Sequence, residues 1–287
     1  MNQKFSKQYV VSVDGSRFSD YAVEVAKSLL KKHDHIKIFH VYSSADSGQA
    51  DPERLRNKYE VDLIGRYPSS QYSFLWHNND NDDRPIKKIM MSVADGSFGG
   101  VDPDIMVIGY SGWRFHQTDS RRSGHATTLG STADFAMRNI HLPIVLVKQA
   151  PRDVEGKHFV MAVNRSNASK TGLDILYTML TPADRLTVIN VYDDSMDAMG
   201  NTDYQSVKNY YMEDLRENCP TTFCKFEPVM KNGATSTVRT VCDYVEELEE
   251  EVDFFVIAPR ARADKSFSSF TEKAIMEMKC NIILCKV

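Results

Sequence analysis

Several features that would assign a function directly are missing from this sequence of 287 residues. No apolar run approaches the roughly 18–20 residues that a membrane-spanning helix needs. The first residues run straight into a strand pattern, without a secretory hydrophobic region or cleavage site. The net charge of −4 excludes a chain that is basic throughout and binds nucleic acid through charge alone. We therefore expect a cytoplasmic protein that binds neither membranes nor nucleic acid.

Common catalytic and metal-binding motifs are missing as well. The first strand is not followed by a dinucleotide-binding G-x-G-x-x-G, and there is no P-loop, G-x-S-x-G elbow or H-E-x-x-H. The five cysteines are an odd number and form no C-x2-C pair, which favours reduced thiols and argues against zinc. The sequence therefore predicts no catalytic residue and no metal site, and we expect the chain not to be an enzyme.

An internal repeat organises the chain. Four segments recur in the same order in both halves, and the first two pairs lie 150 residues apart. Such colinear matches predict a duplicated domain. The matching segments are Tyr9–Ser16 with Phe159–Ser166, Ile36–Tyr42 with Leu186–Tyr192, Asp104–Gly109 with Asp253–Ala258, and Leu142–Lys148 with Cys280–Lys286.

The polar segment from Gln149 to Lys157 carries Pro151 and Gly156, a composition typical of a linker. We predict domains at 1–149 and 158–287, joined by a linker at 150–157. In each half short apolar strands alternate with amphipathic helices, which predicts a parallel sheet with helices on both faces. The expected fold is α/β, with two tandem doubly wound domains of five parallel strands each. One of the expected strands of the second half is Thr222–Phe226.

Ligands of open parallel sheets bind beyond the carboxyl ends of the strands, so the loops after the strands are the candidate sites. In the first half Val13–Ser16 follows the first strand, and Gly109–Gly112 follows the fourth. Gly130–Thr132 then opens a helix. Glycines allow a close approach of backbone amides to an anion, and a helix N-terminus adds free N–H groups. The alternative is that the glycines only turn the chain between strand and helix.

These segments together resemble the universal stress protein family. The resemblance rests on V-D-G-S at Val13–Ser16, H-V-Y at His40–Tyr42, V-I-G-Y-S-G at Val107–Gly112, and G-S-T at Gly130–Thr132. It covers nearly the whole chain as a tandem pair and is strongest in residues 8–148. The family commonly dimerises through its last strands. The resemblance therefore implies either a homodimer or a monomer that forms an internal pseudo-dimer by pairing 144–148 with 282–286.

The nucleotide-binding branch of this family has the motif G-x2-G-x9-G-[ST] and binds ATP. Carried onto this sequence, the resemblance implies an adenosine site near the first two strands and a ribose and phosphate site at the glycines. Mg²⁺ would accompany ATP, held mainly by phosphate oxygens and water. AMP or another adenine nucleotide remains an alternative. The implied residues are Val13, Asp14 and Val41 at the adenosine, Gly109, Gly112, Gly130 and Ser131 at the ribose and phosphates, and Thr132 with a further amide or hydroxyl.

Both halves depart from the family motif. In the first half 17 residues separate Gly112 from Gly130, where the family motif has nine. This insert carries Arg114, Arg121 and Arg122. It is either a basic flap over polyphosphate or a solvated surface loop. In the second half Asn164 replaces the acid, and Ala258 and Ala261 replace the glycines. We expect this half not to bind ATP in the family's manner.

The sequence thus leads to a functional hypothesis with alternatives. The favoured hypothesis is a regulatory, stress-response protein in which ATP binds the first domain and acts as a conformational switch. The switch would change a surface that an unidentified protein partner reads. The alternatives are a nucleotide-free scaffold or interaction module and, ranked lower, a slow ATP hydrolase.

Overall fold

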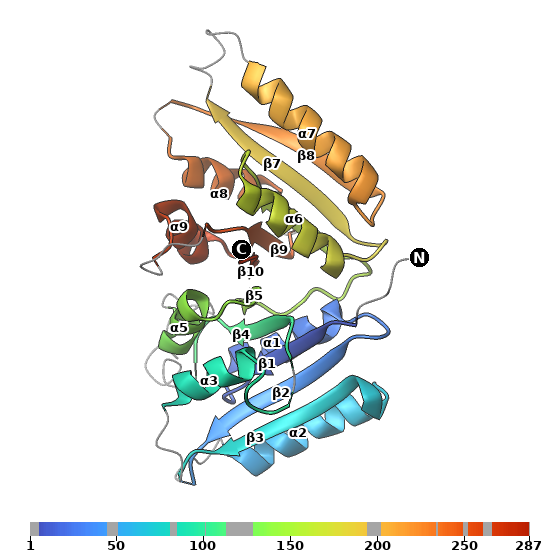
Figure 1. Cartoon of the computed structure of the whole chain (residues 1–287), viewed down its shortest axis with the longest axis vertical. Coiled ribbons are helices and arrows are strands. Elements are labelled where there is room, and N and C mark those ends of the chain that lie inside the picture. The colour runs from blue at the N-terminus through green and yellow to red at the C-terminus, as the bar shows by residue number, and fades with distance from the viewer. Residues whose placement is uncertain are drawn as a thin grey trace. The chain divides into compact units, whose positions relative to one another are not determined.

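The computed structural model describes residues 6–44, 51–80, 85–100, 102–112, 129–193, 202–233, 235–248, 252–260 and 266–286. The chain divides into two compact units, Met1–Pro151 and Arg152–Val287. Figure 1 draws the first unit in blue to green and the second in yellow to red. Over the described ranges, none of the helices combines the length and hydropathy needed to cross a bilayer.

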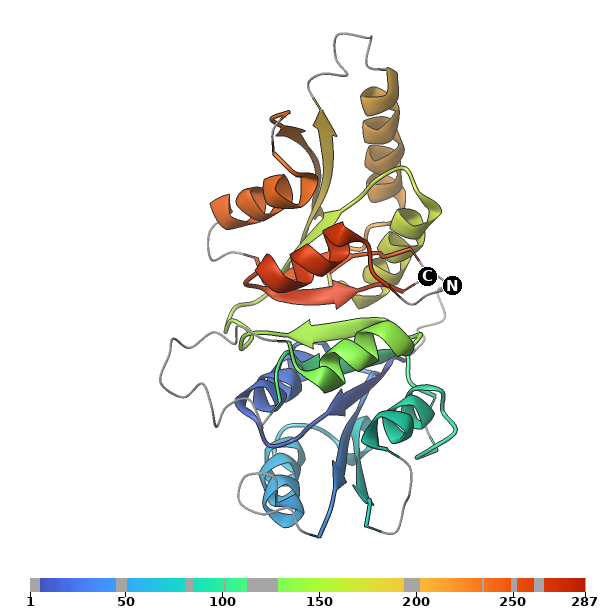
Figure 2. The same ribbon diagram turned by 90° about the vertical axis from the view of Figure 1, so that its left-hand side faces the viewer.

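The first unit is a doubly wound α/β domain with the strand order β3-β2-β1-β4-β5, and all of its strand pairs are parallel. Figure 2 shows α1 and α2 on one face of this sheet and α3 and α5 on the other. The strands are β1 Gln8–Ser12, β2 His35–Tyr42, β3 Tyr72–Asn78, β4 Ile105–Gly109 and β5 Ile144–Val147. The helices are α1 Arg17–Leu29, α2 Pro52–Ile64, α3 Ile86–Ala94 and α5 Ser131–Asn139, with a 3₁₀ turn η2 at Ser69–Gln71.

The second unit repeats this arrangement with the parallel order β10-β9-β6-β7-β8. Here α6 and α7 cover one face, and α8 and α9 cover the other (Figure 2). The predicted fold class, two tandem doubly wound domains, is confirmed. The elements are β6 His158–Ala162, α6 Asn167–Met179, β7 Arg185–Asp193, α7 Thr202–Asn218, β8 Phe223–Lys231, α8 Thr237–Glu247, β9 Phe254–Ile257, α9 Ser269–Glu277 and β10 Asn281–Leu284.

Local sequence signals set where the helices begin. The Ser16 hydroxyl accepts a hydrogen bond from the Ser19 N–H, as expected of an N-cap, and Ser166 does the same at α6. Asp51 caps α2, with Pro52 in the first turn. The central strands are fully buried because helices cover both faces of each sheet. The apolar strand segments of the sequence therefore form the core of each unit.

Aspartates fasten the amino ends of the central strands in both units, and three of the four, Asp34, Asp184 and Asp253, are buried. Asp34 and Asp184 lie 150 residues apart, and each accepts backbone N–H bonds from the segment before the central strand and from the turn before its neighbour. Asp104 and Asp253 accept the first N–H of β1 and of β6. Individual hydrogen bonds of the first unit therefore recur at the corresponding positions of the second unit. The donor to acceptor distances are Lys7 N to Asp34 2.8 Å, Lys31 N to Asp34 3.0 Å, Lys157 N to Asp184 2.6 Å, Thr181 N to Asp184 2.6 Å, Gln8 N to Asp104 2.8 Å and His158 N to Asp253 2.8 Å.

Replacing Asp184 with alanine is expected to lower the free energy of unfolding by about 2–4 kcal/mol, because buried N–H donors lose their acceptor. Asp174→Ala is the matched control: its side chain is 54% exposed and pairs with Lys170 on the helix surface, so its loss should cost less than about 1 kcal/mol. Urea unfolding of both variants measures the difference. Equal losses would show that the buried bonds of Asp184 do not stabilise the strand.

Candidate functional site

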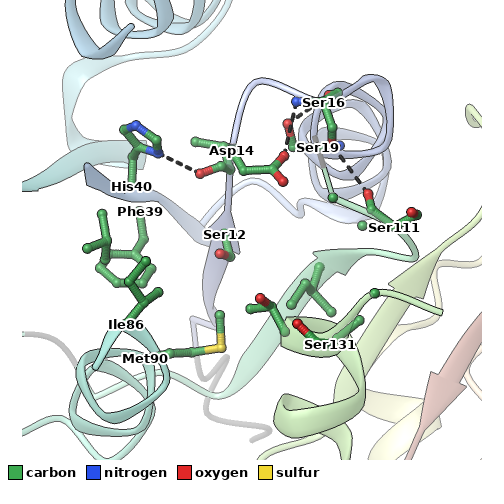
Figure 3. Close-up of a pocket in the computed structure, with 18 residues that line it drawn as sticks. Ser12, Asp14, Ser16, Ser19, Phe39, His40, Ile86, Met90, Ser111 and Ser131 are labelled. Atoms are coloured by element: carbon green, nitrogen blue, oxygen red, sulfur yellow. Dashed lines mark hydrogen bonds between the residues drawn. The ribbon is translucent and has the colours of Figure 1, made fainter. Parts of the chain in front are cut away.

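A pocket of about 340 Å³ lies in the first unit, beyond the carboxyl ends of β1, β2 and β4. The β1–α1 turn forms one side, and the start of α5 and part of α3 form the others (Figure 3). The eight residues that the sequence implicates all line this pocket. They are Val13, Asp14, Val41, Gly109, Gly112, Gly130, Ser131 and Thr132.

The turn after β1 is held by its own side chains. Asp14 Oδ1 accepts the Ser16 N–H at 3.0 Å, and Gly15 between them has φ of +80°, a conformation that favours glycine. The Ser16 hydroxyl also lies 3.4 Å from the Ser111 carbonyl, which ties this turn to the loop after β4. Figure 3 marks both contacts. The turn therefore presents the Asp14 carboxylate at the pocket in a fixed position.

Two of the three predicted glycines allow loops to approach one another. A Cβ at Gly112 would lie 2.8 Å from Asp14 Oδ2, so only glycine leaves room for the carboxylate there. A Cβ at Gly130 would lie 3.3 Å from the Gly112 nitrogen, which is closer than most Cβ contacts. These glycines bring the β4 loop, the β1 turn and the α5 start together around one space.

Gly109 serves packing. A Cβ there would lie 2.8 Å from the backbone carbon and the Cβ of Phe18 in α1. The second unit has Ala258 at this position, and there a Cβ at Gly172 of α6 would lie 2.5 Å from the Ala258 Cβ. At this strand–helix contact the first unit has its glycine in the strand, at Gly109, and the second unit has its glycine in the helix, at Gly172. The Ala258 Cβ thus packs against α6 at the position where α6 carries Gly172.

His40 at the end of β2 has a structural contact. Its Nδ1 lies 2.7 Å from the Val13 carbonyl oxygen, so this nitrogen donates the proton. In the second unit Asn190 donates to the Val163 carbonyl at 2.9 Å, from the position 150 residues later. His40 is therefore satisfied within the core through Nδ1. Its Nε2 is buried and has no hydrogen-bond partner among the residues described.

The N-terminus of α5 opens onto the pocket. Its N-cap is Gly130, and none of the described side chains accepts a hydrogen bond from the first turn. The free N–H groups and the positive end of the helix therefore face the pocket. The corresponding helix of the second unit, α9, is capped by Ser268, whose hydroxyl accepts the Thr271 N–H at 3.2 Å. A side chain therefore caps this helix in the second unit, whereas none of the described side chains does so in the first.

The opposite wall is apolar and was not predicted. Ile86 and Met90 of α3 line the pocket together with Phe39 of β2. Helical periodicity identifies α3 as amphipathic, but it does not say which of its apolar residues border a pocket. Within the described lining Asp14 is the one carboxylate, and neither lysine nor arginine occurs there. The pocket thus combines an apolar wall, hydroxyl groups, one carboxylate and a helix N-terminus.

Some of the sequence predictions concern residues outside the described ranges. They are the insert with Arg114, Arg121 and Arg122, and Ala261 in the second unit. Within the described ranges, no three histidine, cysteine, aspartate or glutamate side chains gather as metal ligands.

Comparison with solved structures identifies the fold as that of tandem universal stress proteins. No family model matches the chain, and no curated protein sequence does. A putative universal stress protein from Pseudomonas aeruginosa superimposes with a TM-score of 0.67 at 10% identity, over 99% of this chain and 94% of that one. A universal stress protein from Archaeoglobus fulgidus gives 0.62 at 12% identity, over 98% of both chains.

The same fold occurs in a protein of another kind. The cytoplasmic domain of a prokaryotic cation chloride cotransporter superimposes with a TM-score of 0.55 at 10% identity, over 98% of this chain and 95% of that one. At these identities the likeness shows the fold, and function has to be argued from the site.

The duplicated contact at His40 predicts how this position tolerates substitution. His40→Asn should retain the bond to the Val13 carbonyl, as Asn190 does in the second unit. His40→Leu leaves this carbonyl without its donor and should be less stable than His40→Asn by about 1–3 kcal/mol. Thermal unfolding of the two variants measures this difference. If both variants are equally stable, the bond does not contribute to folding.

Proposed function

We propose that the first unit binds an adenine nucleotide, ATP foremost, and that the protein is a regulatory protein of the stress-response type. The observation that carries this proposal is the uncapped N-terminus of α5, which opens onto a pocket with an apolar wall and a carboxylate. Free N–H groups at a helix N-terminus suit phosphate oxygens. An apolar wall suits a planar base, and a carboxylate accepts hydrogen bonds from ribose hydroxyls.

Each part of the nucleotide has candidate residues in the pocket. Ser131 and Thr132 would hold phosphate through their backbone N–H groups and hydroxyls, next to Gly112 and Gly130. Val41 and Met90 border the space proposed for the base, and Asp14 that for the ribose. Mg²⁺ would be held by phosphate oxygens and water, because it keeps several waters in most sites.

The second unit is proposed not to bind nucleotide in this way. The Asn164 side chain, which stands in place of Asp14, accepts hydrogen bonds from the Ser166 N–H at 3.1 Å and the Ser169 hydroxyl at 3.0 Å. Ser268 occupies the first turn of α9 with its own hydroxyl. Asp14 accepts the equivalent bond from the Ser16 N–H, so the second unit differs by the neutral side chain at this position, by the added Ser169 bond and by the Ser268 cap.

We propose binding and signalling rather than turnover. In the described lining Asp14 accepts the Ser16 N–H and His40 Nδ1 donates to the Val13 carbonyl, so both side chains hold the turn after β1 in place. Nucleotide would act as a switch that changes a surface read by a protein partner. A nucleotide-free scaffold is the second candidate.

Native mass spectrometry of the purified protein, followed by equilibrium dialysis with millimolar ATP and Mg²⁺, tests the proposal. We expect one adenine nucleotide per chain. No uptake would overturn the nucleotide proposal and favour the scaffold. A parallel assay of phosphate release separates binding from hydrolysis: turnover that a Gly112→Val variant abolishes would identify a slow hydrolase.

Ser131→Asp is expected to weaken ATP binding about tenfold or more while leaving adenosine binding nearly unchanged. A carboxylate at the first position of α5 stabilises the helix but repels phosphate, an effect of about 1–2 kcal/mol. The side chain is exposed, so the fold should be unaffected. Isothermal titration with ATP and with adenosine measures both affinities.

Ser269→Asp is the matched control, because Ser269 is the exposed first residue of α9, the corresponding helix of the second unit. It should leave both affinities at the wild-type values. If Ser131→Asp binds ATP as tightly as this control does, phosphate does not lie at the α5 N-terminus.

A further inference from the structure

Two cysteines of the second unit meet at the junction between α7 and β8. Cys219 directly follows α7, and Cys224 is the second residue of β8, paired in register with Leu186 of β7. The Cys219 and Cys224 side chains lie close enough to interact, and both residues are partly exposed. The other three cysteines, Cys242, Cys280 and Cys285, are buried.

The turn that brings these thiols together is anchored by Thr221, which is 3% exposed. Its hydroxyl is bonded to the Asp184 carbonyl, and it accepts the Phe223 N–H at 3.1 Å. The Cys219 N–H is bonded to the Leu215 carbonyl at 3.2 Å, which continues the helical path up to the turn. Because both arms of the turn are fixed, the contact between the thiols belongs to the folded structure and does not depend on a mobile loop.

The surroundings of the two thiols differ. Cys224 borders a surface depression together with Glu213 and Arg216, so a small reagent from solvent reaches it. Cys219 lies against α7 near Asp214, and burial raises the pKa of its thiol to about 12. Because a reagent from solvent reaches Cys224 directly, Cys224 is the residue that reacts first.

We infer that Cys219 and Cys224 form a reversible dithiol–disulfide pair that a hydroperoxide oxidises. The Cys224 thiolate attacks one peroxide oxygen, the O–O bond breaks, and the other oxygen leaves as hydroxide, which takes up a proton to become water. Cys224 is then a sulfenic acid. The Cys219 sulfur attacks the Cys224 sulfur, the S–O bond breaks, and a second water leaves. Two thiols and one hydrogen peroxide thus give one disulfide and two waters, and a dithiol reductant reverses the change.

This modification site is independent of the proposed nucleotide site, because it lies in the other unit and uses none of the pocket residues. Its place in the fold suggests what the disulfide changes. It would fix the end of α7 to the start of β8, two elements that lie side by side in Figure 1. Asp214, one turn before this end of α7, is bonded to Tyr177 at 2.8 Å and to Lys170 at 2.5 Å, so the disulfide would join an existing set of contacts.

The experiment treats the reduced full-length protein with hydrogen peroxide, quenches it, and counts thiols after denaturation. The reduced chain has five thiols, and we expect three after oxidation, with an intact mass lower by two hydrogen atoms. Peptide mapping without reduction should recover the Cys219–Cys224 disulfide. Incubation with dithiothreitol should restore all five thiols and the original mass.

Three variants make the result specific. Cys219→Ser should form no disulfide and should gain oxygen at Cys224, and Cys224→Ser should keep its thiols under the same treatment. Cys242→Ala is the matched control at a buried cysteine and should form the disulfide as the wild type does. Oxidation of Cys224 to sulfinic acid in the wild type, without a disulfide, would overturn the inference. So would a disulfide between two chains, or no reaction at a peroxide dose that oxidises a free thiol completely.

Discussion

Each unit depends on satisfying the backbone groups at the two ends of a central strand that is buried on both faces. At the amino end aspartate carboxylates accept these N–H bonds: Asp34 and the partly exposed Asp104 in one unit, and Asp184 and Asp253 in the other. Unpaired buried N–H groups are costly, so these positions are constrained wherever the strand is enclosed. Backbone donors at the amino end of the sheet are therefore used in bonds within the chain, whereas the pocket of the first unit lies at the carboxyl end.

At the carboxyl end the two units have diverged. A side chain near the carboxyl end of the second strand bonds the carbonyl after the first strand in both units, although the residue is His40 in one and Asn190 in the other. The helix that opens toward this end begins at Gly130 without a side-chain cap from the described residues in the first unit, and at Ser268 with one in the second. The first unit thus presents backbone donors to a pocket, whereas the second bonds them internally. The N-cap residue thus changes which donors the helix leaves available without altering the fold.

The sequence predicts the repeat, the strand and helix order and the loops of the pocket, because these follow from local periodicity and from the common edge at which parallel strands end. It does not predict contacts that depend on tertiary packing. Gly109 meets Phe18, which lies 91 residues earlier in the chain, and only the packed helix shows why glycine stands there. The strand expected at 222–226 continues to Lys231 through Pro228, because β8 is an edge strand of its unit's sheet in which a proline is tolerated.

Duplication explains how one chain carries two kinds of candidate chemistry. Once one copy holds the proposed nucleotide pocket, the other is free to diverge, and it carries a neutral Asn164 bonded to Ser169 and a Ser268 cap at α9. The freed copy then accepts residues that would disturb the first. The α7–β8 turn brings two thiols close together. Thr221 holds this turn, because its hydroxyl bonds the backbone carbonyl of Asp184. Asp184 is also one of the aspartates that fasten the amino end of the central strand. The same carboxylate framework that the two copies share thus positions the feature that most distinguishes the second.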